Sequence, residues 1–139
     1  MAHSEKLIMV APGGGRSWGA NAIYKQWDLE RFVEATHRFM AGAPTNVVVA
    51  GDAAESELVR AFSSKVARGP IELVGRPLEL VSAFLLRSRL LLCNDSGLLH
   101  LANALGTKTV SIFGPVDERA YGPWGPEAPH AVLTASVPC

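Results

Sequence analysis

The sequence has little cysteine, no long apolar run and no excess of charge of either sign. Its two cysteines, Cys93 and Cys139, lie in an apolar run and at the chain end, without zinc or redox spacing. This favours a reducing compartment and makes the cytosol the default location. No apolar stretch approaches the roughly 18 residues of a membrane span. Lysine plus arginine (13) balance aspartate plus glutamate (13), so no global field favours nucleic acid, and any anion must be held locally.

The composition and the order of the apolar runs indicate one α/β domain over residues 1–139. Apolar residues make up 48% of the chain, and apolar runs alternate with helical patterns, which is typical of a doubly wound, mostly parallel sheet covered by helices. The expected strands are Leu7–Ala11, Asn46–Ala50, Ile71–Val74, Leu90–Asn94, Thr109–Phe113 and His130–Ala135. The expected helices are 29–42, Glu55–Ala67, Leu78–Leu86 and Ser96–Leu105.

The apolar positions of each helical segment predict which side chains face the sheet. The first segment combines a stripe of apolar residues with a glycine that ends it, Gly42. The inward faces of the last two segments are predicted to consist of Leu78, Val81, Phe84 and Leu85, and of Leu98, Leu101, Ala102 and Leu105. A loop rich in glycine and proline, 114–129, follows the fifth expected strand.

A glycine-rich loop follows the first expected strand. Gly13, Gly14 and Gly15 allow the backbone to approach a ligand closely and to offer several N–H groups to a phosphate. The spacing is neither that of the dinucleotide-binding fingerprint nor that of a P-loop, so a plain turn is an equally good interpretation. Lys25, further along the same long connection, is the preferred phosphate ligand; alternatively it is a solvated cation near a helix start.

The segment after the fourth expected strand is the sharpest signal. Asp95, Ser96 and Gly97 form a turn that opens a helix, so its free N–H groups and dipole create an anion site. His100 lies one turn into that helix, where it can hydrogen-bond such an anion. Simple capping by Asp95 and Ser96 is the alternative, as is a structural role for His100.

Two carboxylates, Glu55 and Glu57, follow the second expected strand. A carboxylate at this place can accept both hydroxyls of a ribose, although from the spacing alone a partner for the helix dipole is the more frequent role. No metal-ligand cluster, Ser-His-Asp order or pair of carboxylates at one site supports covalent or metal catalysis.

Together these motifs resemble a known family, glycosyltransferase family 9, the ADP-heptose:lipopolysaccharide heptosyltransferases. The resemblance runs from about Leu7 to the C-terminus. The segments that carry it are Val10–Gly15, Tyr24–Trp27, Val47–Gly51 with Glu55, Asn94–Gly106 and Ile112–Asp117.

The resemblance implies the C-terminal, nucleotide-sugar-binding half of a two-domain GT-B enzyme. An N-terminal acceptor domain, which carries the catalytic base, and the final C-terminal helices are then absent, and no catalytic residue lies in this half. It also implies an inverting transfer of heptose from ADP-heptose to the lipopolysaccharide inner core, without a metal or other cofactor. Association of the full-length enzyme with the inner membrane stays open.

The resemblance also assigns residues to the donor. The glycine loop and Lys25 contact its phosphates, Glu55 binds ribose, and the loop around Arg76 lines adenine. The residues expected to surround the diphosphate and sugar are Asp95, Ser96, Gly97 and His100.

Two alternatives remain at this point. One is a receiver-like signalling module with Asp95 as phosphoacceptor, which fits poorly because glycines stand where its acidic pair belongs. The other is a nucleotide-binding module without transfer activity.

Overall fold

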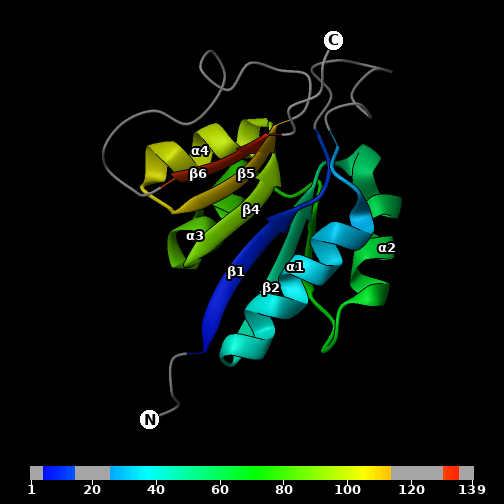
Figure 1. Ribbon diagram of the computed structural model, residues 1–139. Coiled ribbons are helices and arrows are strands. Elements are labelled where there is room, and N and C mark those ends of the chain that lie inside the picture. Colours follow the sequence, from blue (N-terminus) through cyan, green and yellow to red (C-terminus); the bar gives the residue numbers. More distant parts are fainter. Residues whose placement is uncertain (1–4, 15–25, 114–129, 135–139) are drawn as a thin grey trace.

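The computed structural model describes residues 5–14, 26–113 and 130–134. It contains a single sheet of six strands, all parallel, in the order β3-β2-β1-β4-β5-β6 (Figure 1). The strands are β1 (Lys6–Ala11), β2 (Thr45–Gly51), β3 (Ile71–Val74), β4 (Leu90–Asn94), β5 (Thr109–Phe113) and β6 (His130–Thr134). All six expected strands are therefore confirmed within the described residues, with ends that differ by at most one residue.

The helices also follow the sequence prediction, with one change. They are α1 (Leu29–Gly42), α2 (Ser56–Lys65), α3 (Leu78–Arg87) and α4 (Gly97–Leu105). The predicted helix Glu55–Ala67 is shorter at both ends, because Glu55 belongs to a 3-10 turn (Ala53–Glu55) before α2 and the helix ends at Lys65. The Asp52 side chain caps this turn by accepting hydrogen bonds from the N–H groups of Ala54 (2.9 Å) and Glu55 (3.1 Å).

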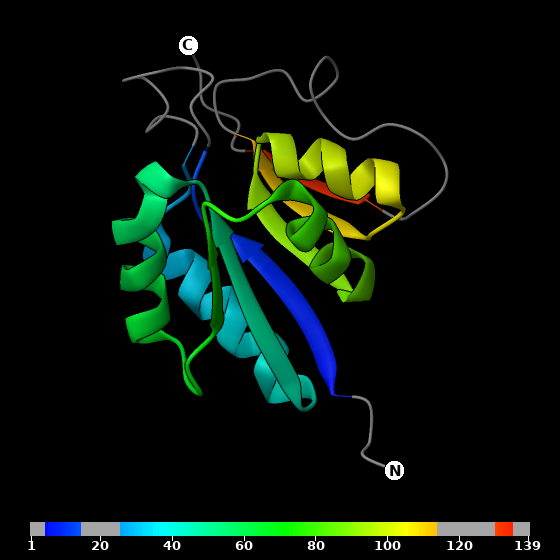
Figure 2. The ribbon, with the colours of Figure 1, turned by 180° about the vertical axis from the view of Figure 1, so that it is seen from behind.

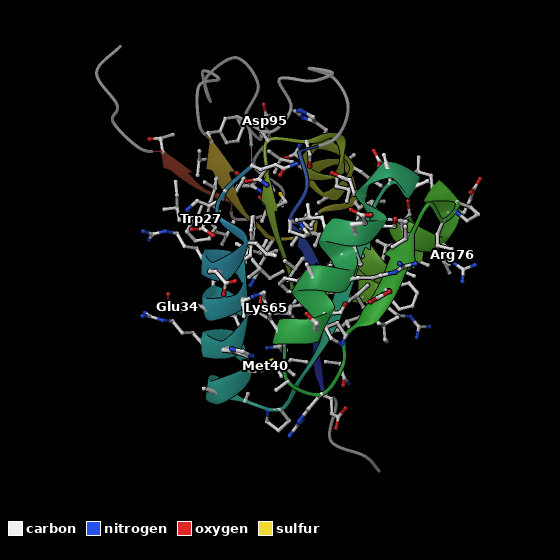
Figure 3. The ribbon with its side chains drawn as sticks, turned by 90° about the vertical axis from the view of Figure 1, so that its right-hand side faces the viewer. Trp27, Glu34, Met40, Lys65, Arg76 and Asp95 are labelled. Carbon is white, nitrogen blue, oxygen red and sulfur yellow. The ribbon has the colours of Figure 1, made fainter. Side chains whose placement is uncertain are left out.

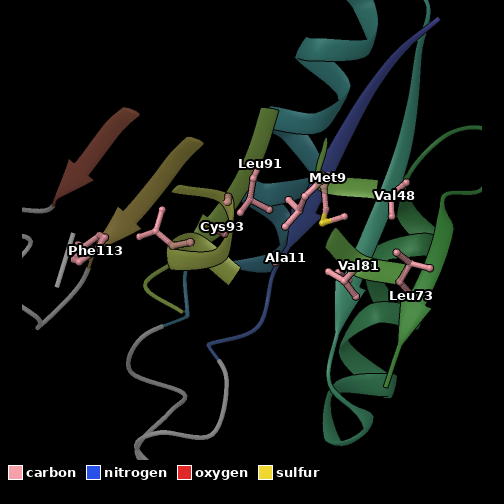
Figure 4. Close-up of a cluster of buried hydrophobic side chains, with 12 residues drawn as sticks. Met9, Ala11, Val48, Leu73, Val81, Leu91, Cys93 and Phe113 are labelled. Carbon is pink, nitrogen blue, oxygen red and sulfur yellow. The ribbon is translucent and has the colours of Figure 1, made fainter. Parts of the chain in front are cut away.

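Helices cover both faces of the sheet, as predicted. The cluster that contains Phe32, Val59 and Phe62 fills the face covered by α1 and α2. The opposite face packs against α3 and α4 (Figure 2), and Figure 4 shows part of that core, with Met9, Val81 and other side chains in contact. Because each central strand is covered on both sides, strands β1 and β4 are apolar without alternation.

Two predicted inward faces were partly wrong. Leu78 was expected to pack on the sheet but is 61% exposed. In α4 the fully buried side chains are Leu99 and Ala102, whereas Leu98, Leu101 and Leu105 are only half-buried. Helix α4 has leucine or alanine on most of its sides, so the sequence pattern could not fix its rotation.

Candidate functional site

The strand order reverses between β1 and β4, and this is the place where open parallel sheets form a crevice at their carboxyl edge. A cavity of about 550 Å³ lies there, lined by residues from the ends of β1, β2 and β3 and from the start of α4. Five predicted site residues line it: Gly13, Glu55, Arg76, Ser96 and Gly97. The fold thus brings together residues that lie up to 84 positions apart in the sequence.

Asn94, the last residue of β4, connects the loops around this edge. Its side chain is fully buried. Its Oδ1 accepts the N–H of Trp27 (2.9 Å), and its Nδ2 donates to the carbonyls of Pro12 (3.0 Å) and Gly13 (3.3 Å). Figure 3 shows Trp27 and Asp95 toward this end of the molecule, with Met40 at the far end of α1. Asn94 therefore fixes the glycine loop against the entry to α1, a role that the sequence analysis did not identify.

Trp27 adds an aromatic contact at the same place. Its ring meets Phe32 edge to face, with centroids 5.1 Å apart and an interplanar angle of 79°. Asp28 then caps α1, accepting the N–H of Glu30 at 3.0 Å. The two residues directly before α1 are thus held by a backbone hydrogen bond, a ring contact and a helix cap.

Glu55 lies directly against Gly13. A Cβ atom placed on Gly13 would lie 1.6 Å from Glu55 Oε2, so only glycine leaves room for this carboxylate. Glu55 Oε1 accepts the N–H of Asp52 at 3.0 Å and completes a capping box with the Asp52 side chain. Glu55 therefore takes part in a capping box, which the sequence analysis did not predict, and the same carboxylate lines the cavity.

The N-terminus of α4 opens onto the cavity. Ser96 has an extended backbone, and its side chain makes no capping bond. Within the described part of the chain, Ser96 Oγ is a buried polar atom without a hydrogen-bond partner. A Cβ atom on Gly97 would meet nothing within 4 Å, so the space beside the first helical turn is open. Such a turn offers unpaired N–H groups and the positive end of the helix dipole to an anion.

Asp95 and His100 are placed differently from the residues that line the cavity. Asp95 is buried just before α4, whereas His100 is exposed, and neither lines the cavity. Burial, and secondarily the charge of Asp95, raises the pKa of the Cys93 thiol far above its usual range. Cys93 is therefore a core side chain rather than a nucleophile.

The third wall of the cavity comes from the loop after β3. Gly75 adopts a left-handed conformation (φ 59°) and donates its N–H to the Gly51 carbonyl at 3.0 Å. This tight turn brings the exposed Arg76 and Leu78 to the rim. Leucine and valine side chains make the wall below them apolar: Leu73, Val81, Leu98 and Leu101. The cavity thus combines a flat apolar wall with a carboxylate and a helix N-terminus.

Some predicted features lie outside the described residues, namely Gly15, Lys25 and the loop 114–129. Gly14 is buried but does not line the cavity. Among residues 5–14, 26–113 and 130–134, no group of three or more His, Cys, Asp or Glu side chains could hold a metal ion. No helix in these ranges is long and apolar enough to cross a bilayer.

Comparisons with known proteins show the family and the fold of this chain. Residues 5–139 match the family described as Glycosyltransferase family 9 (heptosyltransferase). A family 9 glycosyltransferase from Veillonella parvula superposes with a TM-score of 0.80 at 26% identity, over 97% of this chain. The E. coli ADP-heptose lps heptosyltransferase II gives 0.74 at 21% identity and also covers 97% of this chain. The E. coli heptosyltransferase WaaC, solved with ADP, gives 0.77 at 21% identity and the same coverage.

The chain spans only part of these proteins. It covers 36% of the Veillonella chain and 39% of each of the two E. coli enzymes. No curated protein gives a significant match by sequence.

Proposed function

Because the chain belongs to glycosyltransferase family 9, we propose that its carboxyl-edge cavity binds the nucleotide-sugar donor of a heptosyltransferase, ADP-heptose. The observation that carries the proposal is the contact of Glu55 with Gly13 beside the N-terminus of α4. A carboxylate and a helix N-terminus within one cavity can bind the two chemically different parts of such a donor, its ribose and its phosphates.

The proposed phosphate end lies at α4. The unpaired N–H groups of its first turn are suited to the diphosphate, and Ser96 Oγ offers a further hydrogen-bonding group. Open space beside Gly97 allows the oxygens to approach the backbone. Lys25, Gly15 and His100 remain predicted contributors to the same end.

The proposed nucleoside end lies between Glu55 and the apolar wall. The Glu55 carboxylate accepts the ribose hydroxyls, and the purine ring packs on Leu73 and Val81 beneath Arg76. The E. coli WaaC structure was solved with ADP, and a related one with ADP-2-deoxy-2-fluoro heptose, which agrees with an ADP-sugar as the ligand class.

The proposed reaction is a direct, inverting transfer of heptose to a sugar hydroxyl of the lipopolysaccharide core. The acceptor oxygen forms the new bond while the bond to the ADP phosphate breaks, and the acceptor's proton passes to a base. Negative charge develops on the departing phosphate, so donors preorganised at the start of α4 stabilise the transition state. The base and the acceptor site are proposed to lie in a domain outside this chain, so the chain alone binds donor weakly and transfers nothing.

Calorimetric titration of the 139-residue chain with ADP and with pyrophosphate tests the proposal. Gly97→Asp places a carboxylate at the phosphate end and should weaken ADP binding by about tenfold or more, equivalent to roughly 1.4 kcal/mol. Gly97→Asn, of equal size but uncharged, should weaken it less, and Ala104→Glu, at the far end of α4, should leave it unchanged. Undiminished ADP affinity in Gly97→Asp would remove the phosphate assignment.

A second set of variants distinguishes binding of the donor's ribose from binding of its phosphates. Glu55→Ala should weaken ADP binding without changing the affinity for pyrophosphate, because only ADP carries ribose. Lys25→Ala should weaken both, whereas Arg60→Ala, on the exposed side of α2, should weaken neither. Heptosyl transfer by this chain alone would refute the proposed division of labour between domains.

A further inference from the structure

A second concave surface lies at the opposite edge of the sheet, where the strands begin. This groove has a volume of about 700 Å³ and is formed by the starts of β1 and β4 and the ends of α1, α3 and α4. It shares no lining residue with the carboxyl-edge cavity. Its volume is within the roughly 300–1,000 Å³ of pockets that bind small organic ligands.

The groove is basic although the chain as a whole is neutral. Among the described residues, four cationic side chains line it and no carboxylate does: Lys6, Arg38, Arg89 and Lys108. Arg38 pairs with Glu34 at 2.8 Å on the exposed side of α1. The other three have no ion pair within the described part of the chain.

Three of these cations form a row. Lys6 begins β1, Arg89 directly precedes β4 and Lys108 directly precedes β5, and these strands are neighbours in the sheet. The starts of these three strands therefore bring three cationic residues to one edge of the sheet, and all three line the groove. A bound anion would interact favourably with them.

The cations of the row are not residues of the helix ends themselves. Of the three helices that end at the groove, α1 and α4 carry no basic residue in the last turn. Helix α3 does carry one, Arg87, but that residue does not line the groove. The cations lie on the strand starts instead, beside helix C-termini whose negative dipole ends favour positive charge.

Apolar side chains stand beside the cations. Phe39 of α1 is 41% exposed and Leu86 of α3 is 62% exposed, and both line the groove. A free phosphate ion would use only the cations and leave these side chains in water. A ligand that carries a phosphate next to a hydrocarbon chain would use both.

We propose that this groove binds the headgroup of an anionic phospholipid. The phosphate lies among Lys6, Arg89 and Lys108, and the adjoining acyl chain packs on Phe39 and Leu86. Basic and apolar side chains arranged together in this way are how peripheral proteins hold acidic lipid. The site is separate from the proposed donor cavity and does not depend on that function.

Short-chain dihexanoyl-phosphatidylglycerol, used as a soluble monomer, is the probe for calorimetry with the 139-residue chain. It should bind at least tenfold more tightly than dihexanoyl-phosphatidylcholine and than inorganic phosphate. Saturating ADP should not compete with it. Vesicles of equal parts phosphatidylglycerol and phosphatidylcholine should retain the chain in sedimentation, and vesicles of phosphatidylcholine alone should not.

Paired variants locate the binding. Arg89→Gln with Lys108→Gln should reduce the affinity for the phosphatidylglycerol probe about tenfold or more. Arg31→Gln with Arg60→Gln removes the same charge from exposed positions outside the groove and should change it less than twofold. Leu86→Ser, at an exposed position where folding is not at risk, should weaken lipid binding and leave phosphate binding unchanged.

Three results would overturn the proposal. The first is that the two double variants lose equal affinity for the phosphatidylglycerol probe. The second is that inorganic phosphate binds as tightly as this lipid. The third is that polyglutamate displaces the lipid at a concentration below that of the lipid itself. The second result would indicate a simple phosphate site, and the third an acidic protein segment as the occupant.

Discussion

The two edges of one sheet differ in chemistry throughout this molecule. The carboxyl edge has a carboxylate, Glu55, a helix N-terminus and a buried amide, Asn94, that ties three segments together. In the part of the chain that the structure describes, the amino edge has four cations, no lining carboxylate and exposed Phe39 and Leu86. Because all strands run the same way, helix N-termini gather at one edge and C-termini at the other. Parallel topology alone therefore gives the two edges opposite electrostatics.

The two edges also differ in how they are held. At the carboxyl edge, contacts join residues far apart in sequence, such as Asn94 with Pro12 and Glu55 with Gly13. At the amino edge, Asn46 makes an exposed 2.6 Å hydrogen bond to Glu5, while Thr107 Oγ1 donates to the Leu85 carbonyl in a buried 3.0 Å bond. Single substitutions should consequently cost stability at Asn94 and be tolerated at exposed amino-edge positions such as Asn46.

The largest expected effect is on stability and compares Asn94, at the carboxyl edge, with Asn46, at the amino edge. Asn94→Ala removes the partner of the part-buried N–H of Trp27 and of the Pro12 and Gly13 carbonyls, so it should lower the free energy of unfolding by roughly 3 kcal/mol. Asn46→Ala, at the amino edge, should change it by about 0.5 kcal/mol or less. Urea denaturation of the two variants measures both, and equal losses would contradict the contrast between the edges.

A pair of glycines gives the next effect. Gly13→Ala forces the Glu55 carboxylate away, so it should weaken ADP binding about tenfold, or roughly 1.4 kcal/mol. Gly42→Ala, at the end of α1 by the groove, meets nothing within 4 Å and should leave ADP binding unchanged. Calorimetric titration of both variants with ADP provides the comparison.

A double-mutant cycle sharpens that result. If Gly13→Ala acts by displacing Glu55, it should have no further effect on ADP binding once Glu55 is replaced by alanine. If the losses of ADP affinity are additive, Gly13 contributes to binding independently of Glu55, for example because its backbone approaches the ligand directly.

The smallest expected effect is a pH dependence at the amino edge. His130 Nδ1 lies 2.5 Å from Thr109 Oγ1, and loss of hydration lowers the pKa of His130 in the fold. The unfolded chain therefore takes up this proton first as the pH falls through about 6.5, and stability decreases below that pH. The loss is limited to about a few tenths of a kcal/mol, because the ring is only half-buried and solvent still screens it.

Thermal unfolding at pH 7 and pH 5 measures this contribution. His130→Asn keeps a hydrogen-bonding partner for Thr109 but does not titrate, so it should lose slightly less stability than the native chain between these two pH values. An equal or greater loss in the variant would show that His130 does not contribute.

Much of the fold could be predicted because the signals for strands and caps are local. Val47–Ala50 and Leu90–Cys93 are apolar on both faces, which only a covered parallel strand requires. Gly106, predicted to follow the last helix, has φ 76° there and ends α4. The rotation of α4 about its axis could not be predicted from nearby residues, because Leu98, Leu99 and Leu101 are all apolar. Only the packing against neighbouring elements determines that Leu99 is the one fully buried.

The sequence by itself determined the order of strands and helices, the polar residues at the carboxyl edge and the resemblance to family 9, because each depends on residues close together along the chain. Tertiary structure alone decided that Glu55 lies on Gly13, that Asn94 joins Pro12 to Trp27, and that Lys6, Arg89 and Lys108 form one row. These contacts join strands that are adjacent in the sheet but distant in sequence. Their geometry therefore arises only when the sheet assembles.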